Sequence, residues 1–236
     1  MQVVKQDKAA YCPYCLSVKI VRNGIKRTGS QNWKCTMCTK QFQREYLYRG
    51  ADKHVKNKII QMQLRGSGIR DTALLEGVSP ATVLRCLIQE SITAVVKPKK
   101  HYYAQVQIDE LWMYVARKKK KVWLLYAYCY ETDEVLAFTM GKRNSKTVRN
   151  LLIKLKRLEI DWYLTDNWKA FKEELPYYKH LIGKQFTKAI EGVNTWFRVR
   201  IRRLNRRTTC FSKQLVYLYA VIKLAICKRN QHSSYI

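Results

Sequence analysis

Two pairs of cysteines constrain the N-terminal part of the chain more tightly than any other feature of the sequence. They occur in the segments CPYC and CTMC, which are separated by nineteen residues and contain Cys12, Cys15, Cys35 and Cys38. Each Cys-x2-Cys turn directs two thiolates at one point, so two turns at this separation can complete a tetrahedron around Zn²⁺. Strand-like segments with turns at Gly24 and Gly29 lie between them. We therefore predict a zinc ribbon over residues 1–48, with a structural Zn²⁺ and no open coordination position for catalysis.

The overall charge indicates the class of partner. The chain contains 46 Lys+Arg and 17 Asp+Glu residues, a formal net charge of +29 that is spread along the sequence. This balance predicts a polyanionic partner, and nucleic acid is favoured over an anionic membrane because no long basic amphipathic helix is evident. The longest apolar run, Leu215–Ile222, is far shorter than a membrane span of about eighteen residues. With no secretion signal at the N-terminus, we expect a cytoplasmic protein whose thiols remain reduced.

Residues 49–92 have the periodicity of helices and predict an all-α helix-turn-helix domain. A helix pattern that stops at Gly66 is followed by two shorter patterns on either side of Gly77. The last of them opens with Ser79 in the N-cap position and Pro80 in the first turn, a combination that favours a helix start.

The last of these helices carries the residues that could contact DNA. Two short helices across a glycine turn are typical of helix-turn-helix motifs, whose second helix enters the major groove. We expect Thr82 and Arg85 to be exposed on that helix and to reach bases or phosphates. An ordinary small helical bundle is the alternative interpretation. Residues 93–104, which contain Pro98 and several lysines, predict a linker.

From residue 105 onward the hydrophobic period becomes two, and the sequence predicts an α/β domain over residues 105–236. Three strand patterns follow one another, QVQIDELWMYV, KVWLLYAYCYE and EVLAFTMG. An amphipathic helix, a fourth strand and further helices follow, the last beginning at Ser212. This order predicts a mixed sheet with helices packed on it. The acids of the second turn are expected to be solvated, and they are Glu131, Asp133 and Glu134.

Two aspartates of this domain stand out, because an ionised carboxylate in a mostly apolar strand is costly unless a cation accompanies it. Asp109 lies within the first strand, and Asp166 ends the fourth. Alternation along the strand places Asp109 on one face and Glu110 on the other. If the two strands are neighbours, the aspartates come close together and require a cation. Mg²⁺ would serve best, since it prefers carboxylate oxygens and keeps waters for substrate phosphates. The alternative role for Asp166 is a helix N-cap.

A third acid belongs to the segment KAIEGVNTWFRVR. On a helix, Glu191 shares a face with a group of three residues, Asn194, Thr195 and Arg198. This arrangement puts a carboxylate, two polar groups and a phosphate-seeking guanidinium in one stripe. The alternative is a solvated acid that pairs with Lys188. The arginine-rich segment RVRIRRLNRR is predicted to continue the helix and to hold phosphates, with a solvated basic helix as the alternative.

Taken together, these segments resemble the transposases of the Insertion Sequence One family, a group of DDE transposases. The resemblance rests on the paired cysteines, the predicted helix-turn-helix, and the segments DELWMYV, WLLYAY, LTDNW, AIEGVNTWFRVRIRRL and TTCFSK in that order. It implies an RNase H-like catalytic domain whose three acids bind two divalent ions, Mg²⁺ or Mn²⁺, for two-metal-ion catalysis. It also implies binding of terminal inverted repeats, cleavage of element ends and transfer of the 3′-OH strands into target DNA in the bacterial cytoplasm.

Carried over one residue at a time, the resemblance assigns the acidic triad to Asp109, Asp166 and Glu191, and a basic catalytic residue to Arg198. The patterns and the resemblance together also predict residues that contact double-stranded DNA. These are Thr82, Arg85, Asn194, Arg200, Arg202, Arg203, Arg206 and Arg207.

The sequence departs from the family pattern at three positions. Asn167 follows the second aspartate in place of glycine, and Gly192 and Val193 follow the glutamate in place of a basic residue and histidine. These changes affect substrate contacts rather than the triad. Because two element ends are cut in one complex, we expect a homodimer or larger homo-oligomer, with the apolar run Leu215–Ile222 serving either as interface or as core.

Two other functions fit the same features. One is a DNA-binding regulator that represses without catalysis, for which the zinc ribbon and the helix-turn-helix would suffice. The other is an RNase H-fold nuclease or resolvase that acts on branched nucleic acid without transposition. Strand transfer with matched element ends distinguishes a transposase from both.

Overall fold

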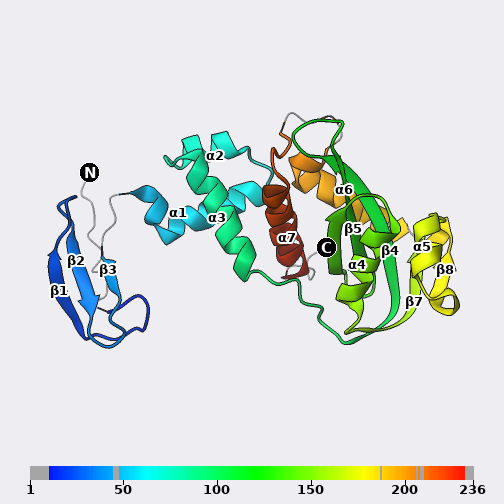
Figure 1. The fold of residues 1–236 in the computed structure, drawn as a ribbon, viewed down its shortest axis with the longest axis horizontal. Coiled ribbons are helices and arrows are strands. Elements are labelled where there is room, and N and C mark those ends of the chain that lie inside the picture. The colour runs from blue at the N-terminus through cyan, green and yellow to red at the C-terminus, as the bar shows by residue number, and fades with distance from the viewer. Residues whose placement is uncertain (1–10, 45–47, 187, 206, 208–209, 232–236) are drawn as a thin grey trace. The chain divides into compact units, whose positions relative to one another are not determined.

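The computed structural model describes residues 11–44, 48–186, 188–205, 207 and 210–231 (Figure 1). The chain divides into two units, residues 1–56 and 57–236, each with its own internal contacts. The finer division into a ribbon, a helix-turn-helix, a linker and a catalytic domain stays a prediction. Within the described ranges, the helices are all too short or too polar to cross a membrane.

The N-terminal unit contains a three-stranded antiparallel sheet (Figure 1). β1 (Ile20–Ile25) pairs with β2 (Gln31–Cys35), which pairs in turn with β3 (Gln41–Gln43). The sequence predicted turns at two glycines, and Gly29 does lie in the turn between β1 and β2. Gly24 instead lies inside β1, at a shift in the β1–β2 register. Both have positive φ angles, 78° and 73°, which favour glycine.

Three helices follow: α1 (Lys53–Leu64), α2 (Ile69–Leu75) and α3 (Pro80–Thr93). The predicted start signal of α3 is confirmed, since the Ser79 side chain accepts a hydrogen bond of 3.2 Å from the backbone N–H of Thr82. The DNA-binding role of these helices stays a prediction.

The turn between α1 and α2 packs closely against a distant part of the chain. A Cβ added at Gly66 would lie 3.2 Å from the carbonyl oxygen of Arg200 and 3.2 Å from the side chain of Arg202. Gly66 also has a φ of +86°, so both its conformation and this close approach require a residue without a side chain.

A mixed five-stranded sheet lies at the centre of the second unit, in the order β6-β5-β4-β7-β8. β4 (Tyr102–Tyr114), β5 (Lys121–Cys129) and β6 (Glu134–Gly141) are antiparallel neighbours. β7 (Glu159–Thr165) runs parallel to β4, and β8 (His180–Ile182) runs parallel to β7. The predicted mixed sheet is confirmed. The fifth strand was not predicted, because three residues are too few to show a period of two.

Helices cover both faces of this sheet, with a buried core on each side (Figure 1). α4 (Ser145–Leu155) and α5 (Lys169–Glu174) lie over one face. α6 (Lys188–Arg200) and α7 (Leu215–Gln231) lie over the other. The expectation that the helix of α6 continues through the arginine-rich segment is wrong, because the helix ends at Arg200. Short 3-10 turns occur elsewhere in the chain, at Arg49–Ala51, Tyr177–Lys179, Lys184–Phe186 and Arg202–Leu204.

The apolar run at the start of α7 belongs mainly to the core. Leu218, Val221 and Ile222 are fully buried against the sheet and α3, whereas Leu215 and Val216 are exposed. Most of the apolar side chains of this run are therefore buried within a single chain. Its use as an interface between copies stays a prediction.

Glu134 contradicts the expectation that the turn acids are solvated, because its side chain is completely buried. Its carboxylate accepts hydrogen bonds from the hydroxyl of Tyr103 (2.7 Å), the hydroxyl of Thr132 (2.8 Å) and the backbone N–H of Lys99 (3.0 Å). Lys99 belongs to the predicted linker. Glu134 thus fastens the linker to the sheet, a role that only the tertiary structure reveals.

We predict that Glu134→Ala lowers the free energy of unfolding by about 3 kcal/mol, because it leaves buried donors without an acceptor. Urea denaturation measures the change. The control is Glu131→Ala, which removes an exposed acid of the same turn and is expected to change stability by less than about 0.5 kcal/mol. Equal effects of the two substitutions would show that the buried hydrogen bonds contribute nothing.

Candidate active site and metal centre

The parallel pairing of β4 with β7 brings two of the predicted acids to one place. Its register aligns Gln107 with Leu164. Continued by two residues, the same register would place Asp109 beside Asp166, which directly follows the end of β7. The two strands that carry these acids are therefore neighbours, as the sequence-based prediction required.

Asp109 is half-buried, and both of its carboxylate oxygens accept hydrogen bonds. The side-chain amide of Asn194 in α6 donates to Oδ2 (2.6 Å), and the backbone N–H of Glu110 donates to Oδ1 (2.7 Å). Burial is the main reason that the pKa of Asp109 is raised, and the negative charges of Asp166 and Glu191 raise it further, while both hydrogen bonds lower it. The charges of Asp166 and Glu191 therefore both act on Asp109.

Asp166 is half-buried and shapes the loop in which it lies. Its Oδ1 accepts a hydrogen bond of 3.0 Å from the backbone N–H of Trp168. The alternative interpretation, a helix N-cap, is wrong, because α5 begins at Lys169 and its N-cap residue is Trp168, which makes no side-chain cap. The carboxylate of Asp166 is therefore tied to its own loop rather than to a helix end.

Glu191 lies on the exposed side of the first turn of α6. Two hydrogen-bonding contacts hold that turn against the sheet. The backbone N–H of Ile190 donates to Oε1 of Gln107 (2.9 Å), and the hydroxyl of Tyr126 lies 3.1 Å from the carbonyl oxygen of Ile190. The same hydroxyl is 2.9 Å from Oδ1 of Asn194. Gln107 and Tyr126 were not among the residues predicted for the site, although Gln107 shares a strand face with Asp109.

The alternative interpretation of Glu191 was a solvated acid paired with Lys188. Among the described residues, these two side chains form no ion pair. Arg198, two turns farther along α6, is half-buried.

Glu110 points to the opposite face of β4, as alternation predicted. Its side chain is only 7% exposed and pairs with Arg143, whose Nη2 lies 2.6 Å from Oε1. Burial raises the pKa of Glu110 to about 6 despite the lowering effect of Arg143, and the charges of Asp166 and Asp109 also raise it. A fourth carboxylate that the sequence analysis did not assign to the site therefore lies in the same electrostatic environment.

The three predicted acids offer the oxygen ligands that Mg²⁺ and Mn²⁺ prefer. Within the described part of the chain they do not form a group close enough to share one ion, as the cysteines do. Wider spacing is compatible with a two-ion site, because the ions lie about 3.5–4 Å apart and Mg²⁺ keeps several of its waters. The donor chemistry thus fits divalent cations.

The four predicted cysteines of the N-terminal unit form a compact group that could hold a metal ion. Their sulfur atoms all lie within 4.8 Å of one another, with 3.6 Å between Cys12 and Cys38 and 3.6 Å between Cys15 and Cys35. Four sulfurs at about 2.3 Å from one tetrahedral Zn²⁺ would be roughly 3.8 Å apart. Backbone amides, that of Cys38 foremost, lower the pKa of Cys35 to about 7, which favours the thiolate that a metal requires. This group could bind zinc.

Four of the residues predicted to contact DNA are exposed cations, and they are Arg85, Arg200, Arg202 and Arg207. Arg206 lies outside the described residues. The predicted exposure of Thr82 is wrong, because Thr82 is 5% exposed and its hydroxyl lies 3.0 Å from that of Ser79. Asn194 is occupied by Asp109 and Tyr126, which favours a positioning role over contact with DNA.

Arg203 also contradicts its predicted role. It is 8% exposed, and its guanidinium donates to Gln63 of α1. The side-chain amide of Gln63 donates in turn to the hydroxyl of Thr72 (2.7 Å). A buried arginine held in this way joins α1 to the segment after α6 and is not available to phosphates.

The turn between β4 and β5 adds a cationic surface that the sequence analysis did not assign to DNA. Every residue from Arg117 to Lys121 is an exposed Lys or Arg. The turn is anchored where the backbone N–H of Ala116 donates to the carbonyl oxygen of Ser212 (2.9 Å). It projects from the carboxyl half of β4, the half that carries Asp109.

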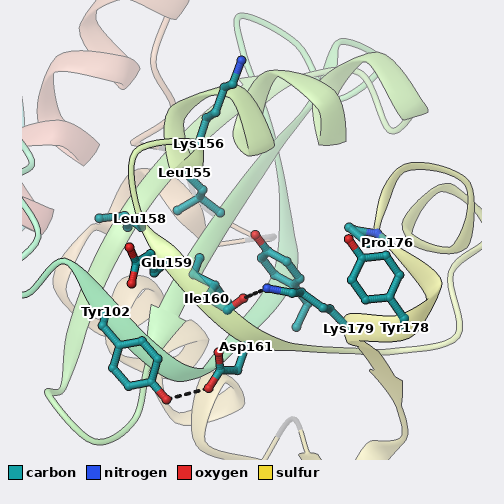
Figure 2. Close-up of a pocket in the computed structure, with 11 residues that line it drawn as sticks. Tyr102, Leu155, Lys156, Leu158, Glu159, Ile160, Asp161, Pro176, Tyr178 and Lys179 are labelled. Atoms are coloured by element: carbon teal, nitrogen blue, oxygen red, sulfur yellow. Dashed lines mark hydrogen bonds between the residues drawn. The ribbon is translucent and has the colours of Figure 1, made fainter.

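A cavity of about 500 Å³ lies at the other end of β7 (Figure 2). Among the residues that line it, the hydroxyl of Tyr102 donates to Asp161 (2.5 Å), and Lys179 donates to the carbonyl oxygen of Ile160 (2.8 Å). The predicted acids do not line this cavity. It is formed by the amino end of β7, whereas Asp166 follows the carboxyl end, so it is separate from the candidate site.

Comparison with known proteins identifies relatives of this chain. Residues 104–231 match the family model described as IS1 transposase. The chain is 43% identical over 109 residues to the insertion element iso-IS1n protein InsB of Shigella dysenteriae, covering 46% of this chain and 83% of that protein. It is 31% identical over 134 residues to the insertion element IS1 9 protein InsB of Escherichia coli strain K12, covering 57% of this chain and 80% of that protein.

One solved structure that was matched is a simian T-cell lymphotropic virus intasome in complex with the PP2A regulatory subunit B56 gamma. The match has a TM-score of 0.38 and 12% identity, and covers 72% of this chain and 64% of that chain.

The departure at Gly192 generates a prediction about stability. A Cβ added there would meet no atom within 4 Å, and glycine inside a helix costs about 1 kcal/mol relative to alanine. We therefore expect Gly192→Ala to raise the free energy of unfolding by about 0.5–1 kcal/mol. Val193 is 2% exposed, so Val193→Ala should lower it by about 2 kcal/mol. Urea denaturation of both variants tests this, and a less stable Gly192→Ala protein would contradict it.

Proposed function

The chain belongs to the IS1 transposase family, and from that premise we propose that it cuts the ends of an insertion element and joins the freed 3′-OH strands to target DNA. The observation that carries this proposal is the parallel pairing of β4 with β7, whose register leads toward Asp109 and Asp166. It is supported by the effect of the charges of Asp166 and Glu191 on the pKa of Asp109. The mixed sheet, with β4 at its centre and helices on both faces, supports an RNase H-like catalytic domain.

The three acids would hold two divalent ions, Mg²⁺ or Mn²⁺, which when bound activate the attacking oxygen and stabilise the leaving 3′ oxygen of an in-line displacement. Asp109 is already oriented for this task by two hydrogen-bond donors. A carboxylate has about four lone-pair sites, so two remain for a cation. Tyr126 holds Asn194, and Asn194 holds Asp109, so the position of this carboxylate depends on contacts from both β5 and α6.

The DNA would be held by cations around these acids. Arg198 follows Glu191 along α6, and the exposed Arg200, Arg202 and Arg207 follow it in the chain. Together with the basic turn Arg117–Lys121, they would contact phosphates on the carboxyl side of the sheet. A separate contact, by Arg85 of α3, would contribute to recognition of the terminal repeats.

Two further parts of the proposal concern the N-terminal unit and assembly. Because its four sulfurs have spacings close to those around a tetrahedral ion, the cysteine group would bind a structural Zn²⁺ and stabilise a ribbon that helps to recognise DNA. Because both element ends must be processed together, the active form on DNA would be a homodimer or larger homo-oligomer.

The experiment that tests the proposal follows labelled element-end DNA, taken from the repeats flanking the gene, in Mg²⁺ and in Mn²⁺. We expect the wild-type protein to give cut and joined products. Asp109→Asn keeps the shape of the side chain but removes its charge, and should lower both steps by about 10²–10³-fold. Asp161→Asn is the matched control, because this acid lies on β7 at the separate cavity and should leave both steps unchanged.

Other outcomes would favour other functions. Metal-dependent cutting without joining would indicate a nuclease or resolvase. Sequence-specific binding by both proteins, with no cutting in either metal, would indicate a regulator.

The zinc proposal has its own test by elemental analysis. Purified protein is expected to contain about one Zn²⁺ per chain. Cys35→Ser should lose the metal, whereas Cys86→Ser, which alters a buried cysteine of α3, should keep it. Equal zinc content in the two variants would exclude the cysteine group as the site.

A further inference from the structure

A second layer of contacts on the far side of β4 leads from Glu110 to the loop that carries Asp166. Arg143 lies between β6 and α4 and reaches Glu110 with two nitrogens, Nε at 2.8 Å and Nη2 at 2.6 Å from the same oxygen, Oε1. The carboxylate is almost fully buried, whereas the Arg143 side chain is 38% exposed. The pair therefore fixes a partly exposed cation at a defined point beside the sheet.

The same guanidinium contacts two indole rings. Its central carbon lies 4.4 Å from the centre of the Trp168 ring and 5.1 Å from that of Trp123 in β5. A planar arginine can form an ion pair at its edge while its face stacks on aromatic rings, which a lysine cannot do. Trp168 also packs edge-on against the buried Phe171 of α5, with ring centres 5.0 Å apart.

Trp168 connects this cluster to the candidate site. Its backbone N–H donates the 3.0 Å hydrogen bond that Asp166 accepts on Oδ1. Glu110, Arg143, Trp168 and Asp166 thus form a continuous series of contacts, and the series begins at the residue next to Asp109 in β4. β4 therefore supplies both Asp109 and Glu110, and Glu110 begins the contacts that lead to the loop of Asp166.

The pair is not arranged for stability alone. Oε2 of Glu110 is buried and has no hydrogen-bond partner among the residues that the structure describes. A buried carboxylate oxygen without a partner is costly, and an apolar pair of similar size would often be more stable. The presence of this costly buried carboxylate next to the predicted acids favours a role for Glu110 in positioning them.

We propose that Glu110 and Arg143 are positioning residues that hold the Trp168 loop, and so set Asp166 at the distance from Asp109 that divalent-metal binding requires. This inference rests on the proposed function for its purpose, but the contact itself can be tested without catalysis. Supporting residues of this kind, outside the ligands themselves, commonly change metal affinity by about 10–100-fold.

The chain offers a matched control for the Glu110–Arg143 pair. Arg149 of α4 binds Glu174 of α5 through two nitrogens, at 3.0 Å and 2.6 Å. This Arg–Glu pair, with a largely buried carboxylate, belongs to the helices that cover the same face of the sheet. In the described part of the chain, no hydrogen bond or ion pair is seen between either residue and the predicted acids or Trp168. Arg143→Lys and Arg149→Lys both keep the positive charge but remove the pair of guanidinium nitrogens that donate to the carboxylate. The two variants therefore differ chiefly in whether the Trp168 loop is affected.

The first measurement is hydrogen exchange of the Trp168 amide, resolved by NMR in the metal-free protein. Arg143→Lys is expected to speed exchange of the Trp168 amide by about tenfold, the effect of losing a contact of the cation–π class. Arg149→Lys should leave this amide unchanged. Trp168→Phe, which retains an aromatic face for Arg143, should retain more protection than Trp168→Ala.

The second measurement is the dependence of element-end cleavage on Mn²⁺ concentration. Arg143→Lys and Glu110→Gln should raise the half-saturating Mn²⁺ concentration by about tenfold and leave the KM for DNA unchanged. A general loss of stability would lower activity at every Mn²⁺ concentration and would not produce this shift.

The outcomes separate the inference from the function on which it rests. If Arg143→Lys exchanges and cleaves like Arg149→Lys while Asp109→Asn is inactive, the positioning role is excluded and the transposase function stands. If the wild-type protein does not cleave DNA, the function fails, and the exchange comparison alone decides whether the Glu110–Arg143 pair holds the loop.

Discussion

The parallel pairing of β4 with β7 is the constraint on which the candidate site depends. β4 continues to pair with β5 as far as Tyr114, but its pairing with β7 ends at Gln107. Asp109 therefore lies just where one edge of β4 loses its neighbour and a loop begins. In sheets with parallel strands, ligands bind outside the carboxyl ends, where neighbouring chains diverge. Asp166 follows the carboxyl end of β7 in agreement with this rule, whereas Asp109 lies within β4 beyond the end of its pairing with β7. α6 contacts β4 on the face that Gln107 and Asp109 share.

The acidic residues of the candidate site contrast with the positive charge of the chain as a whole. The chain as a whole carries a formal charge of +29, which attracts a polyanion over a long range and depends on salt. Against this background, Asp109, Asp166, Glu191 and Glu110 gather at one end of the sheet, and the pKa values of Asp109 and Glu110 are raised in part by their acidic neighbours. Divalent cations would relieve that repulsion, and they would also bring DNA phosphates to a place that carboxylates would otherwise repel.

The sequence predicted those features that depend on local spacing. The cysteine pairs, the Ser79 cap and the opposite faces of Asp109 and Glu110 all follow from short-range patterns, and the structure agrees with each. Burial set by distant contacts was not predictable. In the sequence, Arg203 is indistinguishable from the other basic residues around it. Its burial depends on a hydrogen bond to Gln63, which lies 140 positions away. The Glu110–Arg143 pair was missed for the same reason, because a residue of β4 and a residue of the loop between β6 and α4 become neighbours only when the domain folds.

The most direct test of the central claim is a crystal structure with Mn²⁺ bound, in which anomalous scattering locates the metal without reference to activity. The account predicts an anomalous peak between the carboxylates of Asp109 and Asp166, within about 2.3 Å of an oxygen of each. Glu191 should lie close to the same peak or to a second one. A metal bound elsewhere on the sheet, or Asp166 turned away from Asp109 at saturating Mn²⁺, would contradict it.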